Sequence, residues 1–472
     1  MKTTAKKLAE RSAELAFRPV DVASLAVYRV LFGALLATSS LRFLLEGWVE
    51  RSFVEPSFFF KYWGFEWVEP LPEPFMSGAF VALAVLGVLV ALGLFYRFAI
   101  VGFFLIFTYV ELIDVSNYLN HYYLVSLLAL LMSFLPMNRA FSIDARLFPS
   151  LRVEWVPAWV LYLLRFQVGA VYFFAALAKV EPDWLLHGQP LNIWLSSRTD
   201  TPILGPLLVF PELALVFSWA GFLNDLLAPF LLTHRRTRAL GFAMVVCFHL
   251  ATHLLFNIGI FPFLMMLNAT LFFDPSWPRK LFRRRAFRAP PAMHRPSKPV
   301  RRAAALAIAV YALVQVALPV RSHLYAGSVL WHEQGMRFAW RVMLRKKAGT
   351  VTFRVRSLER TREVHVFPHR YLTAFQEDEM SSQPDLILQL AHRIAEDFRL
   401  RGHHDVEVRA DALVSLNGRR ALAMIDPDAN LAAIRDSLLP ASYILPGPTD
   451  DPAWLAPRTA LRSPTNTNTS LR

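Results

Sequence analysis

Long apolar runs separated by short polar connections occupy most of the chain up to residue 320. An apolar run of about 18 to 25 residues is long enough to cross a bilayer as an α-helix. The block 239–273 is nearly twice that length, and we divide it at 258–262, where glycine and proline interrupt the run. The pattern therefore predicts a polytopic α-helical membrane protein with about nine spans. The predicted spans are 23–45, 76–94, 98–115, 121–135, 157–180, 213–232, the two halves of 239–273, and 303–320.

The pattern changes after residue 320. Segments 350–356 and 362–367 alternate between apolar and polar residues as half-buried strands do, and 386–398 has the spacing of an amphipathic helix. Segments 405–409 and 421–425 are typical of further strands. We therefore predict four regions: a cytoplasmic amphipathic segment (1–20), a transmembrane domain (21–320), an extracytoplasmic mixed α/β, sheet-containing domain (321–445) and a disordered tail (446–472), which is rich in Pro, Thr, Asn and Ser.

Basic residues gather in alternate connections. The connections around 97, 139–152, 234–238 and 279–302 carry arginine and lysine, whereas the opposite loops are acidic or mixed, as at Glu181 and Asp183. By the positive-inside rule, the N-terminus is cytoplasmic and the C-terminal domain lies outside. The net charge of +14 is thus an orientation signal, and we expect a lipid bilayer as partner and no nucleic acid. Compact size and the lack of eukaryotic secretory features favour a bacterial plasma membrane.

Composition excludes several classes of protein. A chain that is 55% hydrophobic and 18% charged is too apolar for an ordinary soluble enzyme. A single cysteine, Cys247, excludes an intrachain disulfide. His249 and His253 are one helical turn apart, but no glutamate lies between them, and we predict no metal site. The sequence also lacks a phosphate-binding glycine loop, a dinucleotide fingerprint and a nucleophile-elbow serine.

Charged and polar residues interrupt the predicted spans. Lys179 lies near the end of the run 162–184, where a cation costs several kcal/mol unless it has a partner or a task. The alternative is that Lys179 reaches the lipid headgroups, as lysine commonly does near helix ends. The other charged and polar residues within the spans would line a buried polar cavity. Alternatively, they would bond one helix to another, as Arg29 would with Asp225 or Glu111. They are Arg29, Glu111, Asp114, His121, Arg165, Gln167, Asn224, Asp225, His249, His253, Asn257 and Gln315.

Several segments together resemble one family. The segment VYFFAALAKVEPDW (171–184) resembles the lysine motif of vitamin K-dependent gamma-glutamyl carboxylases and their bacterial homologues, which share the HTTM membrane domain. The resemblance extends over about residues 20 to 435, with further landmarks in the family's order. These are FKYWGF (60–65), NHYYL (120–124), RFQ (165–167), FHL (248–250), IGIFP (258–262), WPRKL (277–281), WHEQGMRFAWRVM (331–343), QPD (383–385) and SLNGR (415–419).

The resemblance implies an enzyme that oxygenates a reduced naphthoquinone, vitamin K hydroquinone, to its epoxide with O2. That reaction drives removal of a γ proton from protein glutamate, which takes up CO2 to become gamma-carboxyglutamate. By this resemblance Lys179 is the base that activates the hydroquinone, and apolar surroundings favour its neutral amine. His121 steadies the oxygenated intermediate or positions the reactants. We expect Lys179 and His121 to share one enclosed chamber.

Candidate binding residues follow from the same landmarks. The Glu-bearing protein substrate arrives from the outer side, where 331–341 follows the last span and is predicted to form a lip over the cavity. Arg337 or Arg341 would hold a carboxylate and Trp331 or Trp340 the aliphatic stem. Alternatively, these aromatic residues form an interfacial belt. The predicted quinol-binding residues are Arg165, Gln167, His249 and Asn257, the last beside the break at 258–262.

The chain departs from the animal enzymes of the family that it resembles. Those have two adjacent lysines where this chain has Ala178 and Lys179. They also join the membrane and outer domains by a disulfide, which Cys247 alone cannot form, and their longer outer domain holds a propeptide. Two alternative functions therefore stay open. One is a quinol epoxidase or oxygenase without protein carboxylation, and the other is a non-enzymatic membrane carrier.

Overall fold

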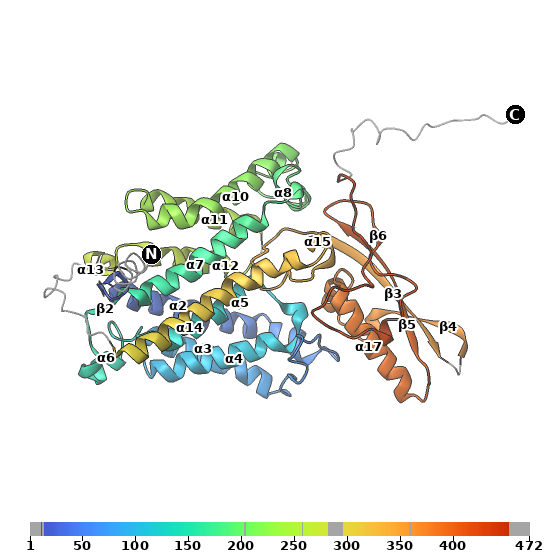
Figure 1. The fold of residues 1–472 in the computed structure, drawn as a ribbon, viewed down its shortest axis with the longest axis horizontal. Coiled ribbons are helices and arrows are strands. Elements are labelled where there is room, and N and C mark those ends of the chain that lie inside the picture. The colour runs from blue at the N-terminus through green and yellow to red at the C-terminus, as the bar shows by residue number, and fades with distance from the viewer. Residues whose placement is uncertain are drawn as a thin grey trace, which may run out of the picture.

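A helical bundle with a sheet-containing domain packed at one end forms the molecule (Figure 1). The computed structural model describes residues 11, 14–202, 204–256, 258–281, 296–357 and 360–452. Within these residues, seven helices are long and apolar enough to cross a membrane, and two shorter apolar helices, α5 and α12, complete the bundle. Their positions agree closely with the predicted spans, so the polytopic membrane fold is confirmed. The helices are α2 (Ala23–Leu45), α3 (Phe75–Leu92), α4 (Tyr96–Ile113), α5 (Asn120–Phe134), α7 (Ala158–Ala178), α10 (Pro211–Thr233), α11 (Arg238–Leu255), α12 (Phe261–Ala269) and α14 (Lys298–Val320).

Helices α2 and α3 pack backbone against backbone through two glycines. A Cβ atom added at Gly33 would lie 2.4 Å from the backbone nitrogen of Ala91, and one added at Gly87 would lie 2.7 Å from that of Ala37. Helix association in lipid depends on such close packing, because the lipid tails are as apolar as the side chains. The two glycines thus hold the first two spans together.

Gly87→Ala should separate α2 from α3 and lower the free energy of unfolding by about 1 to 3 kcal/mol, as overpacking does. Gly78→Ala, on the same helix, is the control, because nothing lies within 4 Å of its added Cβ atom. Alanine there should be neutral or stabilising by up to about 1 kcal/mol. Thermal unfolding of the purified variants in detergent measures both. Equal melting temperatures for the two variants would contradict this account of the packing.

The predicted break between two spans is present. Helix α11 ends at Leu255 and α12 begins at Phe261, and Gly259 between them has a φ of +57°. This left-handed conformation favours glycine. Non-helical backbone at membrane depth occurs where it is buried in protein or lines a cavity. Asn257 lies outside the described residues.

Strands close the end of the bundle that is farther from the sheet domain (Figure 1). β1 (Pro19–Asp21) pairs antiparallel with β2 (Trp155–Pro157). Arg279, in α13 (Trp277–Leu281), forms an ion pair of 2.9 Å with Asp21. Most of the predicted amphipathic segment 1–20 lies outside the described residues, but its last two residues belong to β1.

The outer domain is an antiparallel sheet covered by a helix. Strand order is β4-β3-β5-β6, and α17 (Pro384–Leu400) buries its apolar face against β5. The strands are β3 (Lys347–Ser357), β4 (Arg360–Val366), β5 (Glu407–Leu416) and β6 (Leu422–Ala423). The first two strands and the helix agree with the alternation and helical spacing of the sequence. β5 extends well beyond the predicted 405–409, because its alternating pattern continues through Leu416.

Residues 446–452 pack on this domain. The carbonyl of Asp450 accepts a hydrogen bond of 2.7 Å from Arg419, and a Cβ atom at Gly447 would lie 2.7 Å from the Trp331 ring. The prediction of disorder from residue 446 is therefore wrong for 446–452. The carbonyl of the preceding residue, Leu445, accepts a hydrogen bond of 2.8 Å from the Trp331 ring nitrogen. Residues 453–472 lie outside the described part of the chain.

Polar contacts join the two domains. Asp183, in α8 (Pro182–Leu185), accepts hydrogen bonds of 2.6 and 2.7 Å from Arg419 and one of 2.7 Å from Asn417. On another side, Gln376 of α16 (Ala374–Met380) donates to Asp114 over 2.8 Å. Asp183 belongs to the lysine motif, so one short segment carries both Lys179 and a tie to the outer domain.

Candidate active site

Lys179 is buried at the end of α7. The residue caps the helix, only 5% of it is exposed, and its Nζ lies 2.7 Å from Asp225 Oδ2 on α10. Nζ also donates to the carbonyl of Ala175 over 3.3 Å and lies 5.4 Å from the centre of the Trp184 ring. A side chain with these contacts does not reach the lipid headgroups, so that alternative is wrong.

Asp225 gives Lys179 a partner that the sequence analysis did not assign to it. The other carboxylate oxygen of Asp225 accepts a hydrogen bond of 3.1 Å from Asn224, and Asp225 is 7% exposed. The carboxylate is thus the partner that a lysine buried at this depth requires. Arg29 does not pair with Asp225 as suggested. It donates instead to the carbonyl oxygens of Val90 and Phe141.

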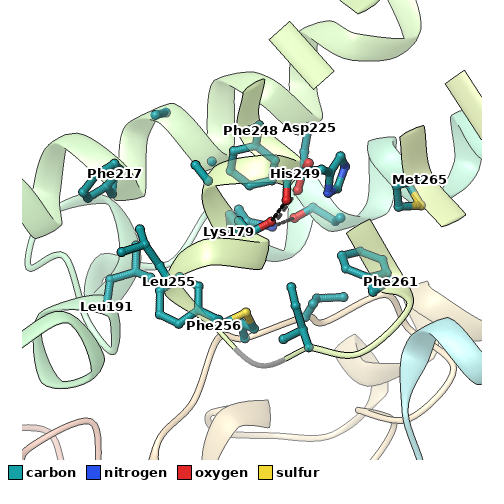
Figure 2. Close-up of a pocket in the computed structure, with 18 of the residues that line it drawn as sticks. Lys179, Leu191, Phe217, Asp225, Phe248, His249, Leu255, Phe256, Phe261 and Met265 are labelled. Atoms are coloured by element: carbon teal, nitrogen blue, oxygen red, sulfur yellow. Dashed lines mark hydrogen bonds and ion pairs between the residues drawn. The ribbon is translucent and has the colours of Figure 1, made fainter. Parts of the chain in front are cut away.

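A narrow cavity of about 100 Å³, the Lys179 chamber, adjoins this ion pair (Figure 2). Besides Lys179 and Asp225, its polar lining includes His249 and Tyr172, and most of the other lining residues are apolar. His249 is 1% exposed, and its Nε2 lies 3.4 Å from the Tyr172 hydroxyl. Its Nδ1 has no hydrogen-bond partner among the described residues. A buried nitrogen without a partner beside a cavity is a position for a polar ligand atom.

His121 lines a second, wider cavity of about 420 Å³, the His121 chamber. Arg42 of α2, Glu111 of α4 and Phe261 of α12 line it from the membrane domain, and Glu379 of α16 lines it from the outer domain. Burial raises the pKa of Glu379, whose carboxylate accepts a 2.7 Å hydrogen bond from Gln383. This chamber thus lies where the two domains meet.

Four residues line both cavities, and we call them the partition: Ile258, Phe261, Val342 and Met343. The centre of the Phe261 ring is 5.8 Å from that of His121 and 5.6 Å from that of His249. The expectation that Lys179 and His121 share one enclosed chamber is therefore wrong. They occupy neighbouring chambers, because the break before α12 places Phe261 between them.

Two predicted quinol-binding residues lie away from both chambers. Arg165 donates hydrogen bonds of 2.8 and 3.1 Å to the carbonyl oxygens of Leu271 and Phe273. Gln167 accepts one of 2.5 Å from the Tyr311 hydroxyl. At about 1.5 Å per residue, Arg165 is about 21 Å along α7 from Lys179. Of the four predicted quinol-binding residues, His249 lines the Lys179 chamber, and Asn257 is outside the described residues.

The segment 331–341 is packed into the protein. Arg337 pairs with Asp385, and Arg341 lies 3.5 Å from Glu181. Trp331 and Trp340 are 2% and 1% exposed, so neither belongs to an interfacial belt. None of the four predicted residues lines either chamber. The two residues that follow, Val342 and Met343, belong to the partition.

Sequence reasoning singled out neither Arg42, which lines the His121 chamber, nor the pairing of Asp225 with Lys179. Both residues were detectable as charges inside apolar runs, but a run does not show which charge meets which. Within the described residues, no group of three or more His, Cys, Asp or Glu side chains is placed to hold a metal ion.

Comparison with known families covers both domains. The family model of the HTTM domain matches residues 17–277, more than half of the chain. The model of the vitamin K-dependent gamma-carboxylase lumenal domain matches residues 300–450, starting within α14. No solved structure matches the chain. With a buried lysine in the matching motif and both domains in the family's order, the chain belongs to the vitamin K-dependent gamma-glutamyl carboxylase family as an integral membrane protein with an HTTM domain.

Proposed function

We propose that this chain is a membrane enzyme that couples oxygenation of a reduced naphthoquinone, vitamin K hydroquinone, to carboxylation of protein glutamate, with O2 and CO2 as co-substrates. The observation that carries the proposal is the buried Lys179–Asp225 pair on a largely apolar chamber. A few convergent polar groups in an apolar cavity are typical of sites for flat organic ligands. The family match supports the reaction class.

The residues of the Lys179 chamber suit a hydroquinone. Lys179 and His249 offer nitrogen atoms to its hydroxyl groups, and His249 Nδ1 has no other partner among the described residues. Met265 and Met343 line the narrow cavity, and methionine side chains adapt their shape readily. When bound, the hydroquinone supplies the oxygen chemistry that generates a base strong enough for a glutamate γ proton.

The ion pair acts as one base. Lys179 Nζ accepts a proton from a hydroxyl group in the chamber while it passes one of its own to Asp225 Oδ2, 2.7 Å away. The pair then consists of an ammonium and a carboxylic acid. It has gained one positive charge, which stabilises the deprotonated oxygen beside it. The apolar lining excludes water, which would otherwise quench a strong base.

The glutamate substrate reaches the site from the outer side. The His121 chamber is bounded by Phe375 and Glu379 of the outer domain, so a side chain can reach it from that side. His121 positions the reactants there, next to the partition. We place the N-terminus in the cytoplasm and the outer domain outside, on the distribution of basic residues. We place the chain in a bacterial plasma membrane, on its compact size and its lack of eukaryotic secretory features.

Purified protein in nanodiscs, given reduced vitamin K and oxygen, should form the epoxide, as measured by chromatography. With a Glu-containing peptide, labelled CO2 should enter the peptide. Epoxide without label would identify a quinol oxygenase that does not carboxylate protein, an alternative that the separation of the two chambers favours. No epoxide, under conditions where a family member is active, would favour the non-enzymatic carrier.

A further inference from the structure

Arg42 is a cation in the His121 chamber. It lies in the last turn of α2, and among the described residues that line the chamber it is the one arginine or lysine. Its ion-pair contact is a long one, 3.8 Å from Nε to Glu46 one turn later, and the Glu46 side chain is 49% exposed. A half-exposed pair at this distance is weak. Arg42 can therefore bind another carboxylate.

Arg42 and His121 flank the same point of the backbone. A Cβ atom added at Gly259 would lie 3.5 Å from Arg42 Nη2 and 4.0 Å from His121 Nε2. Gly259 also lines the chamber and directly follows Ile258 of the partition. The guanidinium and the imidazole thus both lie beside Gly259, next to the partition.

The other candidate arginines are already engaged. Arg337 binds Asp385 and Gln383, and Arg341 faces Glu181. Neither lines the chamber. Among the described residues that line the His121 chamber, Arg42 is therefore the arginine that an entering carboxylate can bind.

We infer that Arg42 binds the carboxylate of the substrate glutamate side chain in the His121 chamber. The inference rests on the proposed function and names the residue that recognises its acceptor. Removal of a proton beside a carboxylate adds negative charge to a group that is already anionic. A guanidinium on that carboxylate lowers the cost, and its fork of donors matches the two oxygens.

Two acids also line this chamber, Glu111 and Glu379. Neither forms an ion pair with Arg42 within the described part of the chain. Glu379 is instead hydrogen-bonded to Gln383, and burial raises its pKa, which favours the uncharged acid. The guanidinium of Arg42 is therefore not neutralised by these groups and attracts the carboxylate to its side of the chamber.

Binding is tested without turnover, in the absence of oxygen, with two fluorescent peptides that differ only in Glu against Gln. Wild-type protein in nanodiscs should bind the Glu peptide more tightly. In Arg42→Gln that preference should fall by roughly tenfold to a hundredfold, the value of a charge-assisted hydrogen bond. Arg42→Lys, which keeps the charge without the fork, should retain part of the preference. Arg198→Gln is the matched control, because Arg198 is exposed and lines neither chamber.

Kinetics give the second readout. Arg42→Gln should raise the KM for the Glu peptide while the KM for the hydroquinone stays at its wild-type value, which also shows that the variant is folded. An unchanged preference for Glu over Gln in Arg42→Gln, or the lack of a preference in wild type, would overturn the inference. Neither result would contradict the proposed function. That function would be contradicted if wild-type protein formed no epoxide from reduced vitamin K and oxygen.

Discussion

Lys179→Arg should form vitamin K epoxide at least about a hundredfold more slowly than wild type, since a positioned general base contributes roughly 10² to 10⁴ in rate. Arginine keeps the positive charge beside Asp225 but does not give up its proton at any pH that the protein tolerates. The variant therefore retains the ion pair and loses the base. Epoxide measured by chromatography under saturating hydroquinone tests the prediction.

Lys179→Met separates the chemical role from the structural one. Methionine leaves Asp225 buried without its cation, which should lower the free energy of unfolding by about 3 to 5 kcal/mol. The double variant Lys179→Met/Asp225→Asn removes both charges and should recover most of that stability without recovering epoxidation. Thermal unfolding in detergent measures stability. Epoxidation by Lys179→Arg near the wild-type rate would contradict the proposal that Lys179 is the general base.

Arg419→Met should loosen the packing of the outer domain on α8. Arg419 makes two hydrogen bonds to Asp183, and each side chain is 11% exposed. Without Arg419, the Asp183 carboxylate keeps its hydrogen bond from the Asn417 side chain but has lost its cation. The free energy of unfolding should fall by about 3 to 5 kcal/mol. Hydrogen exchange followed by mass spectrometry should show faster exchange in α8 and at the Asn417 end of β5.

Arg420→Met is the matched control for this prediction. Arg420 is the next residue along the chain and is exposed, so its replacement should leave exchange in both segments unchanged. Wild-type exchange in Arg419→Met would show that the ion pair contributes little to docking. The prediction bears on a difference from the animal enzymes that the chain resembles. They tie these domains by a disulfide, whereas Cys247 lies alone on α11, and here polar bonds to Asp183 connect the domains.

The spans could be predicted from the sequence because lipid offers the backbone no hydrogen-bond partners, so apolar helices of bilayer length are required. The same physics singled out Lys179, since a cation in an apolar run needs a partner. Glycine and proline at 258–262 located the break before α12. The alternating patterns of β3 and β4 predicted a sheet after the last span.

Only the tertiary structure decided which polar residues meet. Hydropathy reports how deep a residue lies in the membrane, but not which neighbouring helix its side chain faces. Asp225 comes 46 residues after Lys179, and their contact depends on how α10 packs on α7. Arg165 shares α7 with Lys179 and still lies remote from the chambers, because position along the helix axis separates them. The partition likewise exists only because residues from the α11–α12 break and from the segment after α15 (Val329–His332) converge in space.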